Sequence, residues 1–146
     1  MPGSDESYDP AEASHQALLG IKRELKRHPV VTTVDGFPAG AFTQIVAHLY
    51  VERWGVHRDD ATLTVRWFAG ERADARPEFS FHYSDGRTDF GWHHEPNPHV
   101  DGWGHFQKQR EAGSDYSYEA FTFPSQNPTR LVWEIMSILR SKLEPE

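Results

Sequence analysis

Histidines gather in one short segment of this chain, Trp92–Phe106. Four of the nine histidines lie there, beside two carboxylates and two tryptophans. Histidine is the side chain best placed to exchange protons near neutral pH, and it is also the commonest metal ligand. We therefore expect the chemistry of this protein in and around this segment.

A predicted β-hairpin brings two more polar residues to the same place. The strands Glu78–Tyr83 and Thr88–Trp92 flank Ser84-Asp85-Gly86-Arg87, and Asp-Gly favours a two-residue turn. With Ser84 opposite Arg87, the apolar side pairs Tyr83 with Thr88, Phe81 with Phe90 and Phe79 with Trp92. The other side pairs His82 with Asp89 and Glu78 with His93, within reach of hydrogen bonds.

Acid–base cleavage of a phosphodiester, catalysed without a metal, is the reaction that these residue types favour. It needs a group that deprotonates the 2′-hydroxyl, a group that protonates the leaving oxygen, and a cation for the developing charge. A carboxylate beside an imidazole fixes its tautomer and raises its basicity. The candidate catalytic residues are His82, Asp89, His93, His99 and His105, and the candidate substrate contacts are Arg66, Arg87, Trp92 and Trp103.

A zinc-like divalent metal at the loop is the minor alternative, and no cofactor is expected. The spacing of the candidate ligands matches no recognised metal motif. Pro96 and Pro98 should hold the loop extended, so that neighbouring histidines diverge. The candidate ligands are His93, His94, His99 and His105 with Glu95 or Asp101.

A third interpretation assigns no chemistry to these residues. His82 and Asp89 would then be a cross-strand surface pair worth about 0.2–1 kcal/mol. The chain would be a non-enzymatic protein- or ligand-binding domain with an aromatic and histidine-rich surface loop.

Composition limits the class of protein. A length of 146 residues fits one domain, and a net charge of −7 argues against a generally basic surface that wraps nucleic acid. The absence of cysteine excludes disulfides and cysteine-based zinc sites. No apolar run approaches a membrane span, and the N-terminus lacks the pattern of a signal peptide, so we expect a cytoplasmic protein without membrane contact.

Apolar periodicity predicts the elements that must position the candidate site. We expect residues 1–12 to form a disordered tail and residues 13–146 to form a single domain. A helix is predicted over Ala11–Arg27, with Ser14 as its N-cap and His28-Pro29 as its end. A closing helix starts at Asn127-Pro128.

Strands are predicted between these two helices, and Trp92–Phe106 is predicted to be a loop because prolines and glycines interrupt its pattern. The order of elements predicts an α+β fold, with an antiparallel sheet of about five strands flanked by an N-terminal and a C-terminal helix. Besides the hairpin, the predicted strands are Val30–Val34 (followed by a turn at Asp35–Pro38), Phe42–Val51 (for which a helix is the alternative), Leu63–Trp67 and Tyr116–Phe123.

The order of these features resembles the TumE-type toxin family of toxin–antitoxin systems. The resemblance spans roughly residues 28 to 143 and rests on His28-Pro29-Val30-Val31, Phe79-Ser80-Phe81-His82-Tyr83, the Asp85-Gly86 turn, and the loop residues Trp92, Pro96, His99, Trp103 and His105. It differs from the family pattern in that His93-His94 precedes Pro96 and Gly104-His105-Phe106 replaces Pro-His-His. The resemblance implies a small cytoplasmic toxin that acts on RNA as a ribonuclease and is neutralised by a DNA-binding antitoxin.

Overall fold

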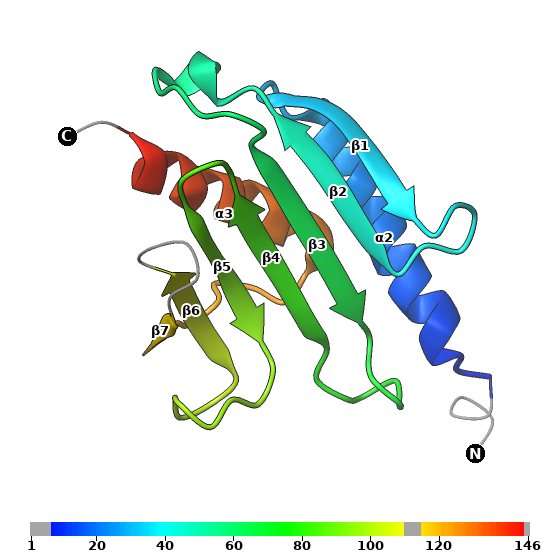
Figure 1. Ribbon diagram of the computed structural model, residues 1–146. Coiled ribbons are helices and arrows are strands. Elements are labelled where there is room, and N and C mark those ends of the chain that lie inside the picture. Colours follow the sequence, from blue (N-terminus) through cyan, green and yellow to red (C-terminus); the bar gives the residue numbers. More distant parts are fainter. Residues whose placement is uncertain (1–6, 110–114, 145–146) are drawn as a thin grey trace.

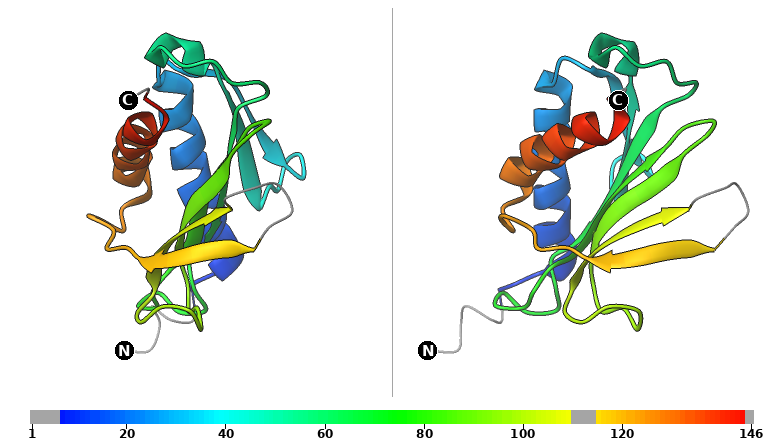
Figure 2. Two further views of the ribbon diagram at one scale, coloured as in Figure 1. Left: turned by 60° about the vertical axis from the view of Figure 1, so that its left-hand side comes forward. Right: turned by 90° about the vertical axis from the view of Figure 1, so that its left-hand side faces the viewer.

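Two helices cover one face of a seven-stranded antiparallel sheet (Figures 1 and 2). The computed structural model describes residues 7–109 and 115–144, so residues 1–6 of the expected tail lie outside the described residues. The strands follow one another in chain order, β1 to β7, and each pairs with its neighbour in sequence. Their bounds are β1 Val31–Phe37, β2 Gln44–Leu49, β3 Thr62–Phe68, β4 Glu78–Ser84, β5 Asp89–His94, β6 Gly104–Gln109 and β7 Tyr116–Ala120.

The α+β class and the two flanking helices are confirmed, but the sheet has seven strands rather than about five. The strand β6 was not predicted from the sequence, and it begins at Gly104, inside the predicted loop. A Cβ at this position would lie 1.9 Å from the carbonyl oxygen of Phe121, so the glycine permits close backbone approach. Of the predicted loop Trp92–Phe106, only the segment between the end of β5 at His94 and the start of β6 at Gly104 is a loop in the structure.

The first helix, α2 (Pro10–Arg27), starts one turn earlier than its predicted cap. Asp9 is the N-cap and accepts a hydrogen bond from the backbone N–H of Ala11, and residues 10–12 are helical. The prediction of Ser14 as the cap is wrong, because its hydroxyl donates to the Pro10 carbonyl and accepts from the N–H of Ala69. The predicted end at His28, before Pro29, is confirmed.

The second helix, α3 (Pro128–Leu143), begins as the sequence predicts. Asn127 caps it by accepting from the N–H of Arg130, and Pro128 occupies the first turn. The indole N–H of Trp133 donates to Glu24 of α2 at 2.9 Å, and its ring lies 5.1 Å from that of His28. These contacts join the two helices on the same side of the sheet. None of the described helices is long and apolar enough to cross a membrane.

The core fills the space between the helices and the sheet. Alternation along β3 and β4 points every second side chain inward, as the apolar pattern predicts. Fully buried side chains from the sheet and both helices meet there: Leu18, Ile21, Leu25, Ile45, Leu63, Phe81, Tyr83, Trp92, Leu131, Ile135, Met136 and Leu139. The opposite face of the sheet carries no helix within the described part of the chain (Figure 2).

The region between β1 and β2 differs from the prediction in one respect. Phe42–Val51 does contain a strand, β2, but Asp35 and Gly36 extend β1 instead of turning the chain. The ring of Phe42 packs over Gly36, where a Cβ would lie 2.4 Å from it. The glycine therefore makes room for a core side chain, and the chain turns after Phe37.

The hairpin of β4 and β5 has a longer turn than predicted, and its register is shifted by two residues. Ser84 pairs with Asp89 rather than Arg87, because the Asp85 carboxylate accepts from the N–H groups of Arg87 and Thr88 and closes a four-residue turn. A shift of two keeps each residue on its predicted face. The observed pairs are Tyr83 with Phe90, Phe81 with Trp92, Phe79 with His94, His82 with Gly91, and Ser80 with His93.

A histidine face as candidate active site

Titratable side chains line the sheet face opposite the helices, on the strands β4 to β7. Three adjacent rows cross this face at right angles to the strands. We call the group formed by His82, Asp89, His93, His105, Tyr116 and Tyr118 the histidine face. The rows are Arg66–Ser80–His93–His105, Thr64–His82–Gly91–Gln107–Tyr118 and Thr62–Ser84–Asp89–Gln109–Tyr116.

His82 contacts Asp89 on this face, although the two residues are not directly opposite each other. Nε2 of His82 meets Oδ1 of Asp89 diagonally across β4 and β5, and both side chains are partly buried. The hydroxyl of Tyr116 donates to the same carboxylate oxygen at 2.8 Å. Burial, together with the hydrogen bond to Asp89, raises the pKa of Tyr116 to about 12, so this hydroxyl stays protonated near neutral pH.

Gly91 gives the His82 ring its position. His82 faces Gly91 in the register, and a Cβ at position 91 would lie 2.5 Å from Nδ1 of His82. The missing side chain therefore lets the imidazole lie over the backbone of β5 and reach Asp89. Because Nε2 faces the carboxylate, a neutral ring carries its proton there and Nδ1 is the basic nitrogen.

His93 and His105 form a second cluster beside His82. Their rings are stacked, with centroids 5.2 Å apart and planes 11° apart, and the ring of His82 lies 5.8 Å from that of His93. Nδ1 of His93 is 3.4 Å from the carboxylate of Glu95, which follows β5. Ligand atoms of His93, Glu95 and His105 all lie within 4.8 Å of one another, so this trio could hold a metal ion.

Burial controls the charge and the hydrogen bonding of this pair. It lowers the pKa of His93 to about 4, with further contributions from His105, His82 and Arg66, so His93 is neutral at pH 7. His105 is fully buried. Nε2 of His93 and Nδ1 of His105 are buried without a hydrogen-bond partner among the described residues. Each unmade bond costs about 1–3 kcal/mol, which marks both nitrogens as places where a ligand would be favoured.

The loop between β5 and β6 folds back over this face. The amide nitrogen of Asn97 lies 3.4 Å from Nε2 of His105, and its oxygen accepts from the N–H of His99 at 2.7 Å. The exposed ring of His99 stacks on Tyr118 with centroids 4.5 Å apart. His99 thus lies at the end of the row that contains His82.

The structure brings Arg66 to the face with the predicted histidines, where its Nε donates to Gln44. Three other predicted substrate contacts lie elsewhere. Trp92 is fully buried in the core, and Arg87 donates to the carbonyl of His57 beyond the hairpin turn. Trp103 packs near His94, whose ring points to the core side and contacts the Pro77 carbonyl. His93 and His94 do diverge as expected, because neighbouring residues of a strand face opposite sides.

Three residues of the site were not singled out from the sequence. Tyr116, Gly91 and Asn97 each fix a histidine or its carboxylate partner. The alternation of Tyr116 with Tyr118 is a period-two signal that could have placed both rings on one face. The pairing of β7 with β6, which carries Tyr116 to Asp89, has no local signal.

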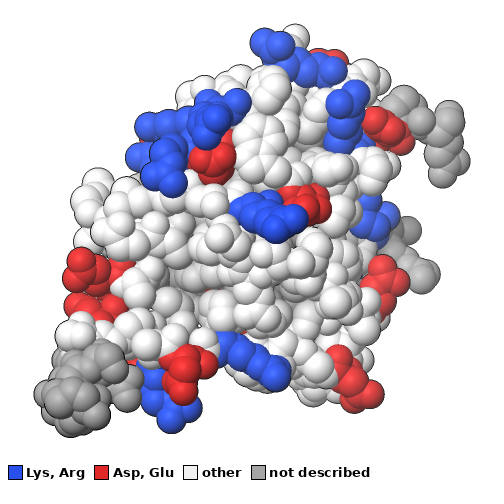
Figure 3. Space-filling model, turned by 180° about the vertical axis from the view of Figure 1, so that it is seen from behind, with Lys and Arg blue, Asp and Glu red and all other residues white. Residues whose placement is uncertain are grey.

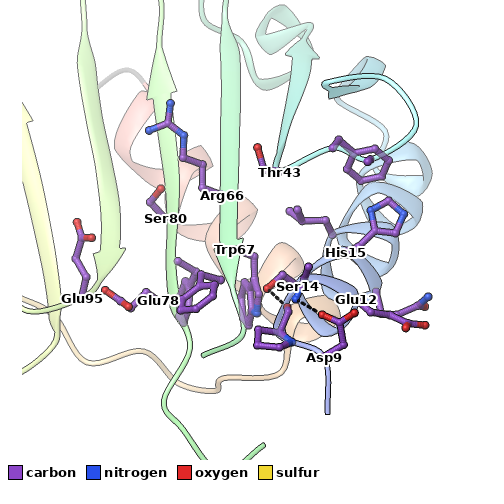
Figure 4. Close-up of a pocket in the computed structure, with 18 of the residues that line it drawn as sticks. Asp9, Glu12, Ser14, His15, Thr43, Arg66, Trp67, Glu78, Ser80 and Glu95 are labelled. Carbon is purple, nitrogen blue, oxygen red and sulfur yellow. Dashed lines mark hydrogen bonds between the residues drawn. The ribbon is translucent and has the colours of Figure 1, made fainter. Parts of the chain in front are cut away.

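A hollow of about 1070 Å³ borders the histidine face (Figure 4). It runs from the first turns of α2, past Trp67, to Arg66 on β3, Ser80 on β4 and Glu95, which follows β5. His93 also lines it. A ligand longer than one side chain could therefore lie against the row that contains Arg66 and His93.

Charge on the helix-covered side is mixed. Lysines and arginines lie among aspartates and glutamates there (Figure 3). On α2, Glu24 takes part in ion pairs with both Arg23 and Arg27. Opposite charges so close together cancel much of each other's field, so this side offers no strong attraction to a polyanion.

Comparison with known proteins adds no relative. No family model, no curated protein and no solved structure matches this chain.

Proposed function

We propose that this protein is the toxin of a toxin–antitoxin module and that it cleaves RNA on the histidine face by acid–base catalysis that needs no metal ion. The observation that carries the proposal is the contact of His82 with Asp89, to which Tyr116 donates a further hydrogen bond. The resemblance of the sequence to TumE-type toxins supports the toxin class. It also implies a DNA-binding antitoxin as the partner.

His82 is the general base in this proposal. Asp89 holds the proton on Nε2, so Nδ1 accepts the proton of the ribose 2′-hydroxyl. The 2′-oxygen then attacks the neighbouring phosphorus, and the bond from phosphorus to the 5′-oxygen of the next nucleotide breaks. The products are a 2′,3′-cyclic phosphate and a free 5′-hydroxyl.

The leaving 5′-oxygen needs a proton, and His99 is the group that supplies it. His93 is unsuited to this role, because a pKa of about 4 leaves it neutral at pH 7. His99 is exposed and lies at the end of the row of His82. Arg66, in the neighbouring row, supplies positive charge to the phosphate as negative charge develops.

An RNA-cleavage assay in excess EDTA tests the proposal. We expect wild-type protein to release fragments that end in 2′,3′-cyclic phosphate, and we expect His82→Asn and His99→Ala each to lower the rate by about 100-fold or more. His57→Ala is the matched control, because the His57 side chain is 84% exposed and its charged neighbours are Glu52 and Asp59, which are not part of the histidine face. A wild-type chain that neither cleaves RNA nor slows the growth of an expressing host would refute the proposal.

A further inference from the structure

We propose that His93, His105 and Glu95 form a binding site for a zinc-like divalent transition-metal ion on the histidine face. The site is separate from the proposed RNA chemistry, because its ligands do not include His82, Asp89 or His99. It also differs from a metal site made by the loop alone, since two of its three ligands come from the paired strands β5 and β6.

The positions of the ligand atoms are close to those that a bound ion requires. Ligands of tetrahedral zinc lie about 2.1 Å from the ion, and hence about 3.4 Å from one another. Nδ1 of His93 and the Glu95 carboxylate are already 3.4 Å apart, and one ligand atom from each of the three residues lies within 4.8 Å of the others. The Glu95 side chain is 47% exposed and can move the remaining distance.

The imidazole of His105 carries unmet bonding capacity that points to a ligand. His105 is 0% exposed, yet its Nδ1 has no hydrogen-bond partner among the described residues. Because His93 and His105 are directly opposite in the register, both rings extend from fixed backbone on the same face.

The donor set selects the class of ion. Two imidazole nitrogens and one carboxylate oxygen suit zinc, cobalt or nickel, whereas calcium and magnesium prefer oxygen ligands. Three protein ligands leave a fourth position for water or an anion.

Binding of one ion by both His93 and His105 should change the relative orientation of their rings. A metal bound to an imidazole lies near the ring plane, so the planes of His93 and His105, now 11° apart, must turn toward each other. We therefore expect the ring signals of these two histidines to change on binding.

Calorimetric titration of tag-free, EDTA-stripped protein with Zn²⁺ tests the site, and Co²⁺ absorption reports its geometry. We expect one ion per chain and affinity at least about 100-fold weaker in His93→Gln and Glu95→Gln. His82→Asn and His57→Ala are the controls and should bind as the wild type does. Unchanged affinity in both ligand variants, or the absence of one-to-one binding to the wild type, would overturn the proposal.

The role of His105 is better tested without a substitution, because replacing this fully buried residue, for example in His105→Asn, could unfold the chain. Histidine ring NMR of the wild-type protein provides the test. Zinc should shift the ring signals of His93 and His105 and leave those of His57 unchanged. Shifts confined to other histidines would contradict the site. If the protein binds zinc but does not cleave RNA in EDTA, the metal site is supported and the proposed function is refuted. If it cleaves RNA in EDTA but does not bind zinc, the proposed function is supported and the metal site is refuted.

Discussion

The α-carbon of Gly91 lies beneath the imidazole of His82, so that a methyl group at position 91 would come within 2.5 Å of Nδ1. The same methyl group would lie 2.8 Å from the carbonyl oxygen of Phe81. A residue without a side chain is thus part of the histidine face, because it leaves the space in which the ring reaches Asp89.

Gly91→Ala should displace the His82 ring. We expect the free energy of unfolding to fall by about 1–3 kcal/mol, because the added methyl group overpacks the site. RNA cleavage by the folded protein should fall with it, and urea denaturation and cleavage rates measure the two effects. Gly86→Ala is the matched control, since the nearest atom to its new methyl group would be 3.9 Å away. Equal behaviour of the two variants would contradict the role of Gly91.

Tyr116→Phe should weaken catalysis through Asp89. The variant loses the hydroxyl that donates to this carboxylate, and we expect kcat to fall about tenfold while KM stays unchanged, since a hydrogen bond to a charged group is worth about 1.5–3 kcal/mol. The ring signals of His82 should also change. Tyr118→Phe alters the neighbouring tyrosine on the same face and is the matched control. Its kcat should stay within about twofold of the wild-type value, and the ring signals of His82 should not change.

Asp85 should dominate the stability of the β4–β5 turn. Its side chain is fully buried, accepts hydrogen bonds from Tyr83, Arg87 and Thr88, and lies 3.3 Å from Nε of Arg58. Asp85→Ala leaves these donors unpaired and should destabilise the protein by about 3–5 kcal/mol in urea denaturation. Asp59→Ala, with a side chain 83% exposed, should cost no more than about 0.5 kcal/mol.

The Asp85 carboxylate should also make the free energy of unfolding fall at acidic pH. Burial by itself would raise the pKa of Asp85, but the hydrogen bonds from Tyr83, Arg87 and Thr88 outweigh it and hold the pKa below the ordinary 3.8. A lowered carboxyl pKa stabilises the fold above 3.8, and this contribution is lost as the pH falls through the folded-state pKa. We expect the unfolding midpoint of Asp85→Ala to change less than that of the wild type between pH 5 and pH 3.

A second pH effect should come from His28 at the end of α2. Burial lowers the pKa of His28 below 6.5, and its Nδ1 accepts from the N–H of Val30. The unfolded chain therefore binds the proton more tightly, so the free energy of unfolding is largest above pH 6.5 and falls as the pH drops below it. His28→Asn keeps an acceptor for Val30 and should reduce the difference between unfolding midpoints at pH 7 and pH 5. His93 and His94, whose pKa burial also lowers, contribute to the remaining slope.

The parts of the fold that depend on local pattern could be predicted from the sequence. Alternation in Phe79, Phe81 and Tyr83 gave the buried face of β4, and the Asn127-Pro128 pair gave the start of α3. The side of the sheet on which His82, Asp89 and His93 lie was also correct, because a register shift of two residues preserves faces.

The parts that failed depend on contacts between distant or individual atoms. The turn of the hairpin is set by the hydrogen bonds of the Asp85 side chain, which residue preferences for Asp-Gly do not report. The start of β6 at Gly104 depends on the approach of the Phe121 carbonyl. The hydrogen bond from Tyr116 to Asp89 depends on the pairing of β7 with β6, which brings together strands whose pairing the sequence pattern does not indicate.

The simple strand order has a consequence for how the molecule folds. The residues of the histidine face all come from the consecutive strands β4 to β7, and each of these strands pairs with the next one along the chain. Contacts between sequence neighbours form faster than contacts that close long loops. The slow step is expected to be the docking of α2 against α3, which lie at opposite ends of the chain. The site would then take shape hairpin by hairpin, before the helices seal the other side of the sheet.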